Sequence, residues 1–287
     1  MKCADISDLC LSDGPAVADW RFAIYFPLGI LVLLARVVII LLFALASFLI
    51  PARWRRTSFR VFRLLLGVVV RRNMTPEAAA CVTRQRIIVS NHVSMLDAFA
   101  TLDVGEPVLL RGTALRGDSR WTSSIFRLVE RLSGARFISY EDKRGLANLF
   151  RSWREGQGNN CLYVPAEMTI NNGRGLFRFN PALLSRGLPV VPQALRLNTS
   201  LGLVAHPFLS GGLATLARLL MLPFVTFEVA VLPALEQSEA ESAQEFADRV
   251  QRAIADHLDI PATRFTVADK HAYRSALRSG QRLGRAQ

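Results

Sequence analysis

A histidine and an aspartate in the segment Asn-His-Val-Ser-Met-Leu-Asp, residues 91–97, are the side chains of this chain best placed for acid–base chemistry. The segment follows the apolar run 86–90, so it places His92 at the end of a predicted strand and Asp97 one turn into a predicted helix. An imidazole, with an ordinary pKa near ~6.5, accepts a hydroxyl proton at neutral pH when a carboxylate fixes its tautomer and stabilises the imidazolium. The pattern therefore predicts a general base, His92, oriented by Asp97.

A structural explanation covers part of the same segment. Ser94 followed three residues later by Asp97 fits a capping box, in which both side chains bind free amide groups at the start of a helix. Capping explains Ser94 and Asp97 and leaves His92 unexplained, although a lone histidine is often only a hydrogen-bonded core residue. Both interpretations stay open from the local sequence.

A long apolar segment near the N-terminus predicts a membrane anchor. Between Phe22 and Ile50 the only charged residue is Arg36. As a helix this segment is about 43 Å long, which exceeds the ~30 Å hydrocarbon core of a bilayer. It is too long for a signal peptide, and no cleavage site with a polar mature start follows it. Pro27 leaves a tilted span and a hairpin open, and Arg36, which costs roughly 2.5–3.5 kcal/mol near a bilayer centre, favours a shallow placement.

The charge distribution predicts a lipid partner. The chain has 35 basic and 23 acidic residues, a net charge of +12, which indicates a polyanionic partner. No acidic residue occurs between Trp20 and Pro76, and seven arginines follow the apolar segment: Arg53, Arg55, Arg56, Arg60, Arg63, Arg71 and Arg72. Apolar residues alternate with them, so the stretch favours an anionic membrane surface on the cytoplasmic side. We expect no nucleic-acid partner.

The four cysteines, Cys3, Cys10, Cys81 and Cys161, lack the spacing of metal ligands. We therefore expect no metal site and no disulfide framework. Reduced thiols fit a globular domain that faces the cytosol.

From residue 87 onward, short apolar runs alternate with helical patterns. Strands are predicted at 87–90, 107–110, 136–140, 161–164 and 190–197, and helices at 94–102, 119–132 and 143–154. This order is typical of an α/β fold with a largely buried sheet flanked by helices.

The last third of the chain continues this pattern. A helix at 213–222, too short to span a bilayer, is predicted to cover the core, and a strand follows at 224–232. A second capping box, Ser242 with Glu245, opens a further helix. Basic residues at 270, 274, 278 and 282 predict a solvated face on a fraying tail. The predicted units are a tail (1–20), a membrane segment (21–51), a basic interfacial stretch (52–76), the α/β domain (77–262) and a basic tail (263–287).

Four blocks, in this order, resemble the glycerolipid acyltransferases related to the bacterial lysophosphatidate enzyme. The first is the Asn-His-x-Ser-x-x-Asp segment at 91–97. Residues 134–140 resemble the family's phosphate-binding block, 164–168 its proline-glutamate-glycine-threonine block, and 188–192 its final strand motif. The resemblance implies an acyltransferase-like domain with a mixed sheet, preceded by a membrane hairpin or span.

Within that superfamily the chain is similar to the ancient ubiquitous protein family over most of its length. The similarity involves residues 25–29, Arg36, Pro51, and the stretches 88–93, 175–179, 222–224, 246–251 and 268–270. It implies a protein of the endoplasmic reticulum membrane and of lipid droplets, with its globular domain in the cytosol. That family also carries a ubiquitin-binding module and a segment that recruits a ubiquitin-conjugating enzyme. The residues up to Gln287 contain neither, so we expect no ubiquitin-linked role from them.

Two positions depart from the family's pattern. Tyr140 stands where the phosphate-binding arginine is expected, so a neutral hydroxyl replaces a bidentate cation. Ala166 stands where the block's glutamate belongs, and Glu167 is one place late, which reverses its face on a strand unless the segment bends. Cations that can replace the arginine as phosphate ligands are Arg111, Lys143, Arg144 and Arg174.

The resemblance implies transfer of a fatty acyl group from acyl-CoA to a lysophospholipid, with His92 as general base and Asp97 orienting it. Acyl-CoA is then a co-substrate, and no other cofactor is expected. The predicted substrate-binding residues are Asn91, Ser94, Tyr140, Arg144, Glu167 and Arg174. The alternative is a catalytically impaired domain of the same fold that binds lipid or acts as a scaffold on the same membranes.

Overall fold

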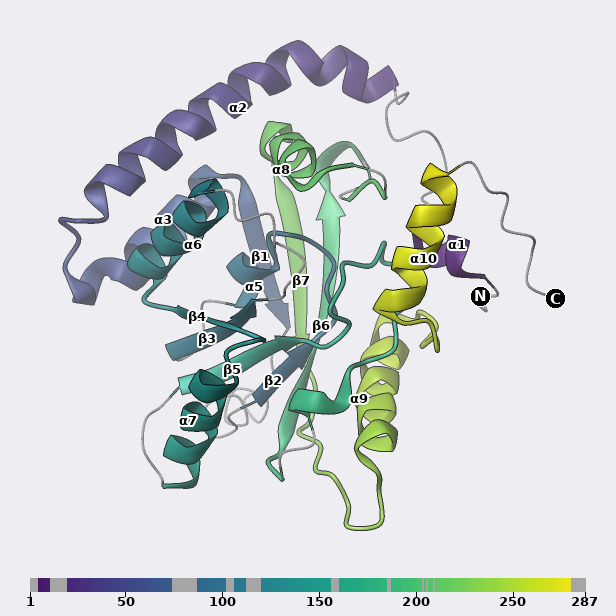
Figure 1. The fold of residues 1–287 in the computed structure, drawn as a ribbon. Coiled ribbons are helices and arrows are strands. Elements are labelled where there is room, and N and C mark those ends of the chain that lie inside the picture. Colours follow the sequence, from purple (N-terminus) through teal and green to yellow (C-terminus); the bar gives the residue numbers. More distant parts are fainter. Residues whose placement is uncertain are drawn as a thin grey trace.

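A mixed seven-stranded sheet forms the centre of the described chain (Figure 1). The computed structural model describes residues 5–10, 20–73, 87–101, 106–111, 120–155, 160–184, 187–202, 204, 206–208 and 210–279. The strands are β1 (Val68–Asn73), β2 (Ile87–Ser90), β3 (Glu106–Arg111), β4 (Arg136–Ser139), β5 (Asn160–Pro165), β6 (Val190–Thr199) and β7 (Val225–Val231). Their order is β1-β7-β6-β2-β5-β3-β4, and every pair is parallel except β6 with β7.

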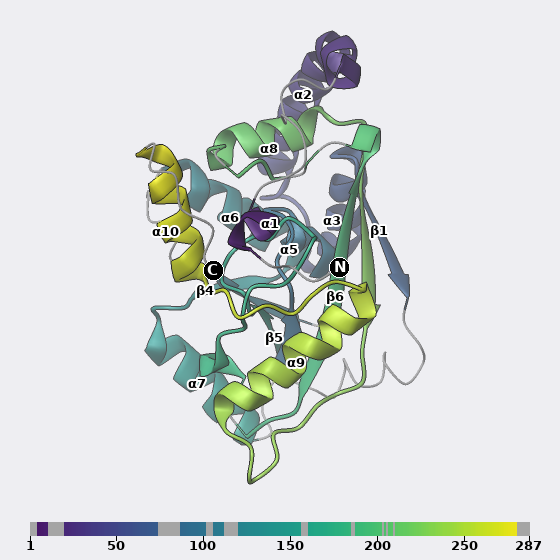
Figure 2. The same ribbon diagram turned by 90° about the vertical axis from the view of Figure 1, so that its right-hand side faces the viewer.

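Helices cover both faces of the sheet (Figures 1 and 2). The helices are α1 (Ile6–Cys10), α2 (Trp20–Ala46), α3 (Arg55–Leu65), α5 (Asp97–Thr101), α6 (Arg120–Ser133), α7 (Lys143–Arg154), α8 (Gly212–Met221), α9 (Ala243–Leu258) and α10 (Val267–Arg278). Ile88 of β2 packs with α3, α5, α6 and α8, whereas Ile87 and Val89 pack with α7 and α9. Because side chains alternate along a strand, a strand buried on both faces is apolar throughout, as β2 is. The predicted α/β architecture is confirmed.

Strand β1 lies where an interfacial stretch was predicted. Residues 68–73 pair in parallel with β7, at the edge of the sheet next to α3. Their sequence, Val-Val-Val-Arg-Arg-Asn, continues the run of arginines that precedes it, and this charge masked the strand signal. Part of the predicted membrane-surface stretch therefore belongs to the domain, and residues 74–86 lie outside the described chain.

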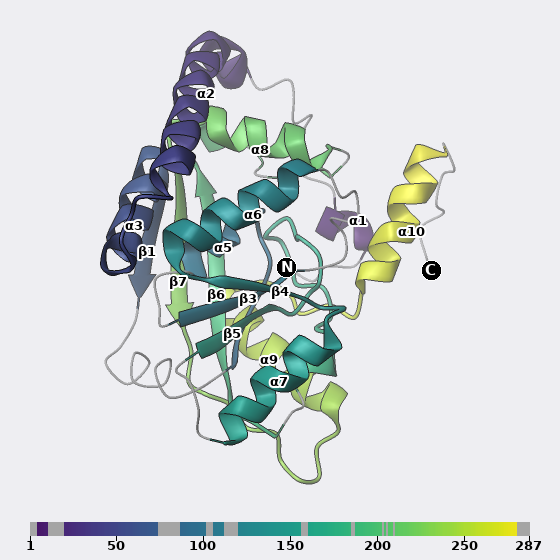
Figure 3. The same cartoon turned by 60° about the vertical axis from the view of Figure 1, so that its left-hand side comes forward.

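Helix α2 runs without interruption through Pro27, so the structure contains no hairpin turned at that residue. Pro27 lies beyond the first turn of the helix and removes one backbone hydrogen bond without ending it. Figures 1 and 3 show α2 arching over the outside of α8 and α3. Its Ala23–Ala46 portion has a mean hydropathy of 3.0, and is long and apolar enough to cross a membrane.

Arg36, the one charged residue in the apolar part of α2, binds this helix to the rest of the domain. Arg36 is only 5% exposed. Its guanidinium donates to three backbone carbonyls at the end of α8, those of Leu220 (2.7 Å), Leu222 (2.5 Å) and Pro223 (2.7 Å). Gly67, with φ +75°, leaves room for it, because a Cβ there would lie 1.9 Å from the guanidinium nitrogen. The contact satisfies carbonyls that the helix end leaves without an amide donor.

Replacing Arg36 with methionine is expected to loosen α2 from α8. The substitution keeps an apolar stem and leaves three carbonyls without their donor, which costs about 1–3 kcal/mol. Amide hydrogen exchange at residues 219–222 is expected to become faster, and the Tm of the chain lower. Arg53→Met is the matched control, since Arg53 is exposed just beyond α2. Equal exchange rates in both variants would contradict a docking role for Arg36.

Part of the predicted C-terminal tail forms helix α10, in which the basic residues Lys270 and Arg274 bind the domain and Arg278 is exposed. Thr266 and Asp269 form a capping box at its start. Lys270 is 8% exposed, donates to the carbonyl of Ile170 and lies 5.3 Å from the ring centre of Phe177. Arg274 donates to the carbonyl of Phe208. The prediction was wrong because these partners are distant in sequence, and residue 282 lies outside the described chain.

Candidate active site

The sheet gathers the predicted site residues along one edge. Strands β2, β5, β3 and β4 are neighbours and parallel, so their carboxyl ends meet at the same edge. His92 follows β2, Glu167 follows β5 and Tyr140 follows β4. Because adjacent strands are about 4.8 Å apart, the end of β4 lies about 14 Å from the end of β2.

His92 and Asp97 are in direct contact. Nδ1 of His92 lies 2.8 Å from Oδ2 of Asp97, and the same oxygen accepts the backbone N–H of Val93 at 2.8 Å. An ionised carboxylate only accepts hydrogen bonds, so beside it a neutral imidazole carries its proton on Nδ1 and presents the lone pair of Nε2. The imidazole side chain is 25% exposed and the Asp97 side chain 11%. The arrangement has the geometry of a general base held in one tautomer by a carboxylate.

Ser94 and Asp97 do not form the capping box that their spacing suggests. The Ser94 hydroxyl accepts the N–H of Leu96 at 3.2 Å, while the Asp97 N–H donates to the Ser94 carbonyl at 3.2 Å. The carboxylate of Asp97 is directed at His92 instead of the start of the helix. Helix α5 accordingly begins at Asp97. The capping box predicted from the spacing of Ser94 and Asp97 is therefore absent.

Asn91 and Ser94 are buried next to His92, each 1% exposed. The Asn91 amide exchanges two hydrogen bonds, both 2.8 Å, with the backbone of Leu195 on β6. Both side chains thus have protein partners, and Asn91 holds the end of β2 against β6. This placement favours a positioning role over the direct substrate contact that was predicted for them.

Glu167 supports the peptide that carries His92. The chain bends after β5, with Met168 at φ 56°, and the bend turns Glu167 inward to 1% exposure. Its carboxyl group accepts the backbone N–H of His92 (2.8 Å), the side-chain amide of Asn171 (2.6 Å) and the backbone N–H of Phe177 (2.8 Å). The predicted bend is present, but it directs Glu167 to the backbone of the domain.

Burial raises the pKa of Glu167 to about 8. The N–H groups of His92 and Phe177, the Asn171 amide and the charge of Lys270 act in the opposite direction. The same burial lowers the pKa of Lys270. A carboxyl group and an amine with shifted pKa values therefore lie beneath the histidine loop.

Of the three other predicted substrate-binding residues, Tyr140 and Arg144 lie near the end of β4, and Arg174 lies in a loop whose Asn171 N–H donates to the His92 carbonyl at 2.7 Å. Tyr140 is partly buried and packs against the hydrophobic cluster that contains residues of α7 and α9. Arg144 is exposed in the first turn of α7. Arg174 is exposed in the loop after Glu167, and its backbone N–H donates to Asn172 at 3.1 Å. The structure brings His92, Asp97 and Glu167 together and leaves Tyr140 and Arg144 near the end of β4.

Two charged or titratable residues near the site were not predicted. The pKa of His206 is lowered to about 4, mainly by burial and next by the charge of Lys270, with a smaller effect from His92. No motif or spacing in the sequence marks His206. Lys270 was interpreted as a surface cation, although Tyr273 and Ala276, both buried, lie three and six residues after it on the same side of α10.

The fold defines the class of protein first. The chain matches the crystal structure of the 1-acyl-sn-glycerophosphate acyltransferase PlsC from Thermotoga maritima with a TM-score of 0.53 and 15% identity, over 80% of this chain and 96% of that chain. The described domain therefore has the fold of a glycerolipid acyltransferase. No protein-family model matches the chain.

Proteins of similar sequence define the class of protein more closely than the fold does. The lipid droplet-regulating VLDL assembly factor AUP1 of Xenopus laevis is 28% identical over 87% of this chain, and lysophosphatidylcholine acyltransferase 2 of Rattus norvegicus is 28% identical over 63%. This chain spans 60% of the first and 34% of the second relative. Fold and relatives support membership of the glycerolipid acyltransferase superfamily, and they confirm the resemblance to the ancient ubiquitous protein (AUP1) family.

Proposed function

We propose that the chain transfers a fatty acyl group from acyl-CoA to the hydroxyl of a lysophospholipid at a membrane surface. The observation that carries this proposal is the 2.8 Å contact between His92 and Asp97 in a partly exposed position at the carboxyl edge of the sheet. Relatives named as lysophospholipid acyltransferases support the choice of reaction.

His92 and Asp97 have different roles in the proposed acyl transfer. Nε2 of His92 takes the proton of the lysophospholipid hydroxyl as its oxygen attacks the thioester carbonyl. The tetrahedral intermediate then collapses, the carbon–sulfur bond breaks, and the imidazolium returns the proton to the CoA thiolate. Asp97 stabilises the imidazolium between these steps, and Glu167 and Asn91 hold the peptide on which the imidazole is mounted.

The membrane association follows from the outer face of α2. Large apolar side chains on this face are more than half exposed: Ile24, Leu28, Leu31, Leu34, Val38, Leu41, Leu42 and Leu45. Arg36 holds the middle of the same helix on α8, so α2 lies against the bilayer surface or shallowly within it, with the domain beside it. The relatives named as lipid droplet-regulating support lipid droplets as a location. The endoplasmic reticulum membrane as a second location, and a globular domain in the cytosol, are part of our proposal.

The test is acyl transfer by the purified full chain in micelles. Acyl-CoA is supplied with each member of a panel of lysophospholipids, and both free CoA and the diacyl product are measured. The proposal predicts product in equal amounts to CoA. Release of CoA without product would indicate thioester hydrolysis, and no release with any acceptor would count against the proposal.

A second candidate is a domain of the same fold with impaired catalysis that serves as a lipid-binding or scaffold factor. Tyr140 and Ala166 favour it, because the family's cation and glutamate are missing from these positions. The inward direction of Glu167 also favours it, since this carboxyl group does not replace the missing one at the edge of the sheet.

Restoring both family residues separates the two candidates. If catalysis is impaired, the double substitution Tyr140→Arg and Ala166→Glu is expected to raise kcat/KM at least about tenfold, the scale of one charge-assisted hydrogen bond. Tyr140→Lys is the control for electrostatic attraction alone, because lysine supplies the positive charge without the bidentate hydrogen bonds of a guanidinium group. Substantial turnover in the wild type that the double substitution leaves unchanged would eliminate the impaired candidate.

A further inference from the structure

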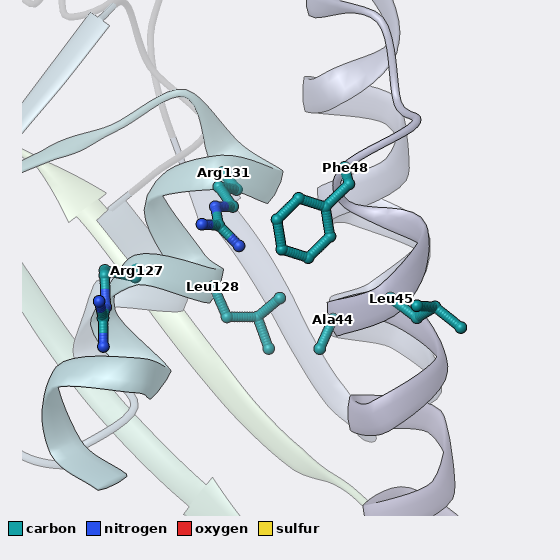
Figure 4. Close-up of a pocket in the computed structure, with 6 residues that line it drawn as sticks. All are labelled: Ala44, Leu45, Phe48, Arg127, Leu128 and Arg131. Carbon is teal, nitrogen blue, oxygen red and sulfur yellow. The ribbon is translucent and has the colours of Figure 1, made fainter. Parts of the chain in front are cut away.

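A groove lies between the end of α2 and the second half of α6. It has a volume of about 390 Å³ and shares no residue with the His92 site. Its lining residues come from both elements: Ala44, Leu45, Phe48, Arg127, Leu128 and Arg131 (Figure 4). Figure 4 shows Phe48 pointing across the groove toward Arg131, with Ala44 and Leu128 facing each other nearby.

One side of the groove is positively charged. Arg127 and Arg131 are four residues apart on α6, so they lie on one face of the helix, and both are exposed. The guanidinium carbon of Arg131 lies 4.2 Å from the centre of the Phe48 ring. Glu130 is directed elsewhere, because its carboxylate accepts the backbone N–H of Phe137 at 3.0 Å. Within the described chain Arg131 forms no ion pair, so its donors can reach an anion.

The rest of the groove is apolar and continues into exposed apolar surface. Leu128 is buried and Ala44 is half-buried between the two helices. At the edge of the groove Leu45 is 71% exposed, Phe48 68% and Leu49 83%. This surface belongs to the end of the helix that is apolar enough to enter a membrane. A ligand here meets carbon on one side, guanidinium groups on the other, and lipid beyond.

We propose that this groove binds one anionic phospholipid, with an acyl chain along Ala44, Phe48 and Leu128 and the phosphate on Arg127 and Arg131. A guanidinium group binds phosphate through two parallel hydrogen bonds, and the lipid surface next to the groove presents phosphate in its headgroups. Free phosphate would leave the apolar part unused, and an uncharged lipid would place no negative charge beside the guanidinium group of Arg131. The bound lipid fixes the end of α2 at the level of the headgroups, independently of any turnover at His92.

Native mass spectrometry of the full chain in detergent tests the proposal. Phosphatidate and phosphatidylcholine of the same acyl chains are added at equal concentration, and the ratio of the two bound lipids is measured. The wild type is expected to prefer phosphatidate. The pair Arg127→Gln and Arg131→Gln is expected to lower this preference at least about tenfold. An unchanged preference would overturn the proposal.

Two further variants separate a lipid site from simple charge. Arg252→Gln with Arg264→Gln removes the same two charges from exposed positions elsewhere, and it is expected to leave the preference unchanged. Ala44→Leu keeps the arginines, narrows the groove and is expected to weaken binding of phosphatidate. Equal loss in the Arg252 and Arg264 pair would overturn the proposal in favour of general surface charge. Displacement of phosphatidate by an equal concentration of inorganic phosphate would overturn it in favour of an anion site.

Discussion

Replacing Asp97 with asparagine is expected to lower kcat for acyl transfer by about 10²–10⁴-fold, the usual contribution of positioned general base catalysis. The substitution removes the negative charge that stabilises the imidazolium of His92. The new amide either presents its NH₂ to Nδ1, which forces the proton onto Nε2, or places it at Oδ1, a buried position without a hydrogen-bond partner in the described chain. Both orientations impair the base.

Initial rates of CoA release by Asp97→Asn and by the wild type, at equal folded concentration, measure this effect. Asp256→Asn is the matched control, since Asp256 is exposed on α9. In the orientation that keeps oxygen at the Oδ2 position, asparagine still accepts the N–H of Val93, so the near-ultraviolet circular dichroism is expected to stay unchanged. A loss of less than about tenfold in kcat would mean that Asp97 does not orient a catalytic base.

Replacing Glu167 with alanine is expected to have the largest effect on stability. The change removes the acceptor of three hydrogen bonds beneath the His92 loop, from the backbones of His92 and Phe177 and the side chain of Asn171. Buried donors without acceptors cost about 1–3 kcal/mol each, and relief of the buried carboxyl group offsets part of this. We expect a net loss of about 2–4 kcal/mol and a Tm lower by about 5–10 °C.

Differential scanning fluorimetry of Glu167→Ala measures this loss. Glu167→Gln, which retains one acceptor oxygen, is expected to fall between the wild type and alanine. Glu239→Ala, at an exposed position, is the control. If Glu167→Ala melts at the temperature of the control, then Glu167 does not support the His92 loop, and its inward hydrogen bonds carry little free energy.

Local patterns predicted most of the sheet because its strands are short apolar runs between helical segments. The predicted bounds of β2 and α7 agree with the structure, since Ile87–Ser90 is apolar and Lys143–Arg154 is strongly amphipathic. Strand β1 and helix α10 were not recognised. Both contain several cations, and what buries or pairs them comes from distant parts of the chain, such as β7 for β1 and Phe177 for Lys270.

The sequence predicted only part of the candidate site, again because some partners are distant along the chain. His92 and Asp97 are five residues apart, so a local motif could indicate their contact. Glu167 lies 75 positions from the His92 amide that it binds, and its direction depends on a bend after β5. Arg36 was interpreted as a cost to membrane insertion, whereas its partners lie 184–187 residues away at the end of α8. A side chain in such a position shows its role only once the fold brings its partners together.

The release of CoA from acyl-CoA by wild type and His92→Ala, with the lysophospholipid that gives the highest rate, tests the central claim most directly. Among the residues that the structure describes, the His92 side chain has a hydrogen bond only with Asp97, so the alanine variant is expected to fold. We predict that wild type forms the diacyl product and that His92→Ala falls to the uncatalysed rate. Equal rates in the two proteins, or none in either, would contradict catalysis by this histidine.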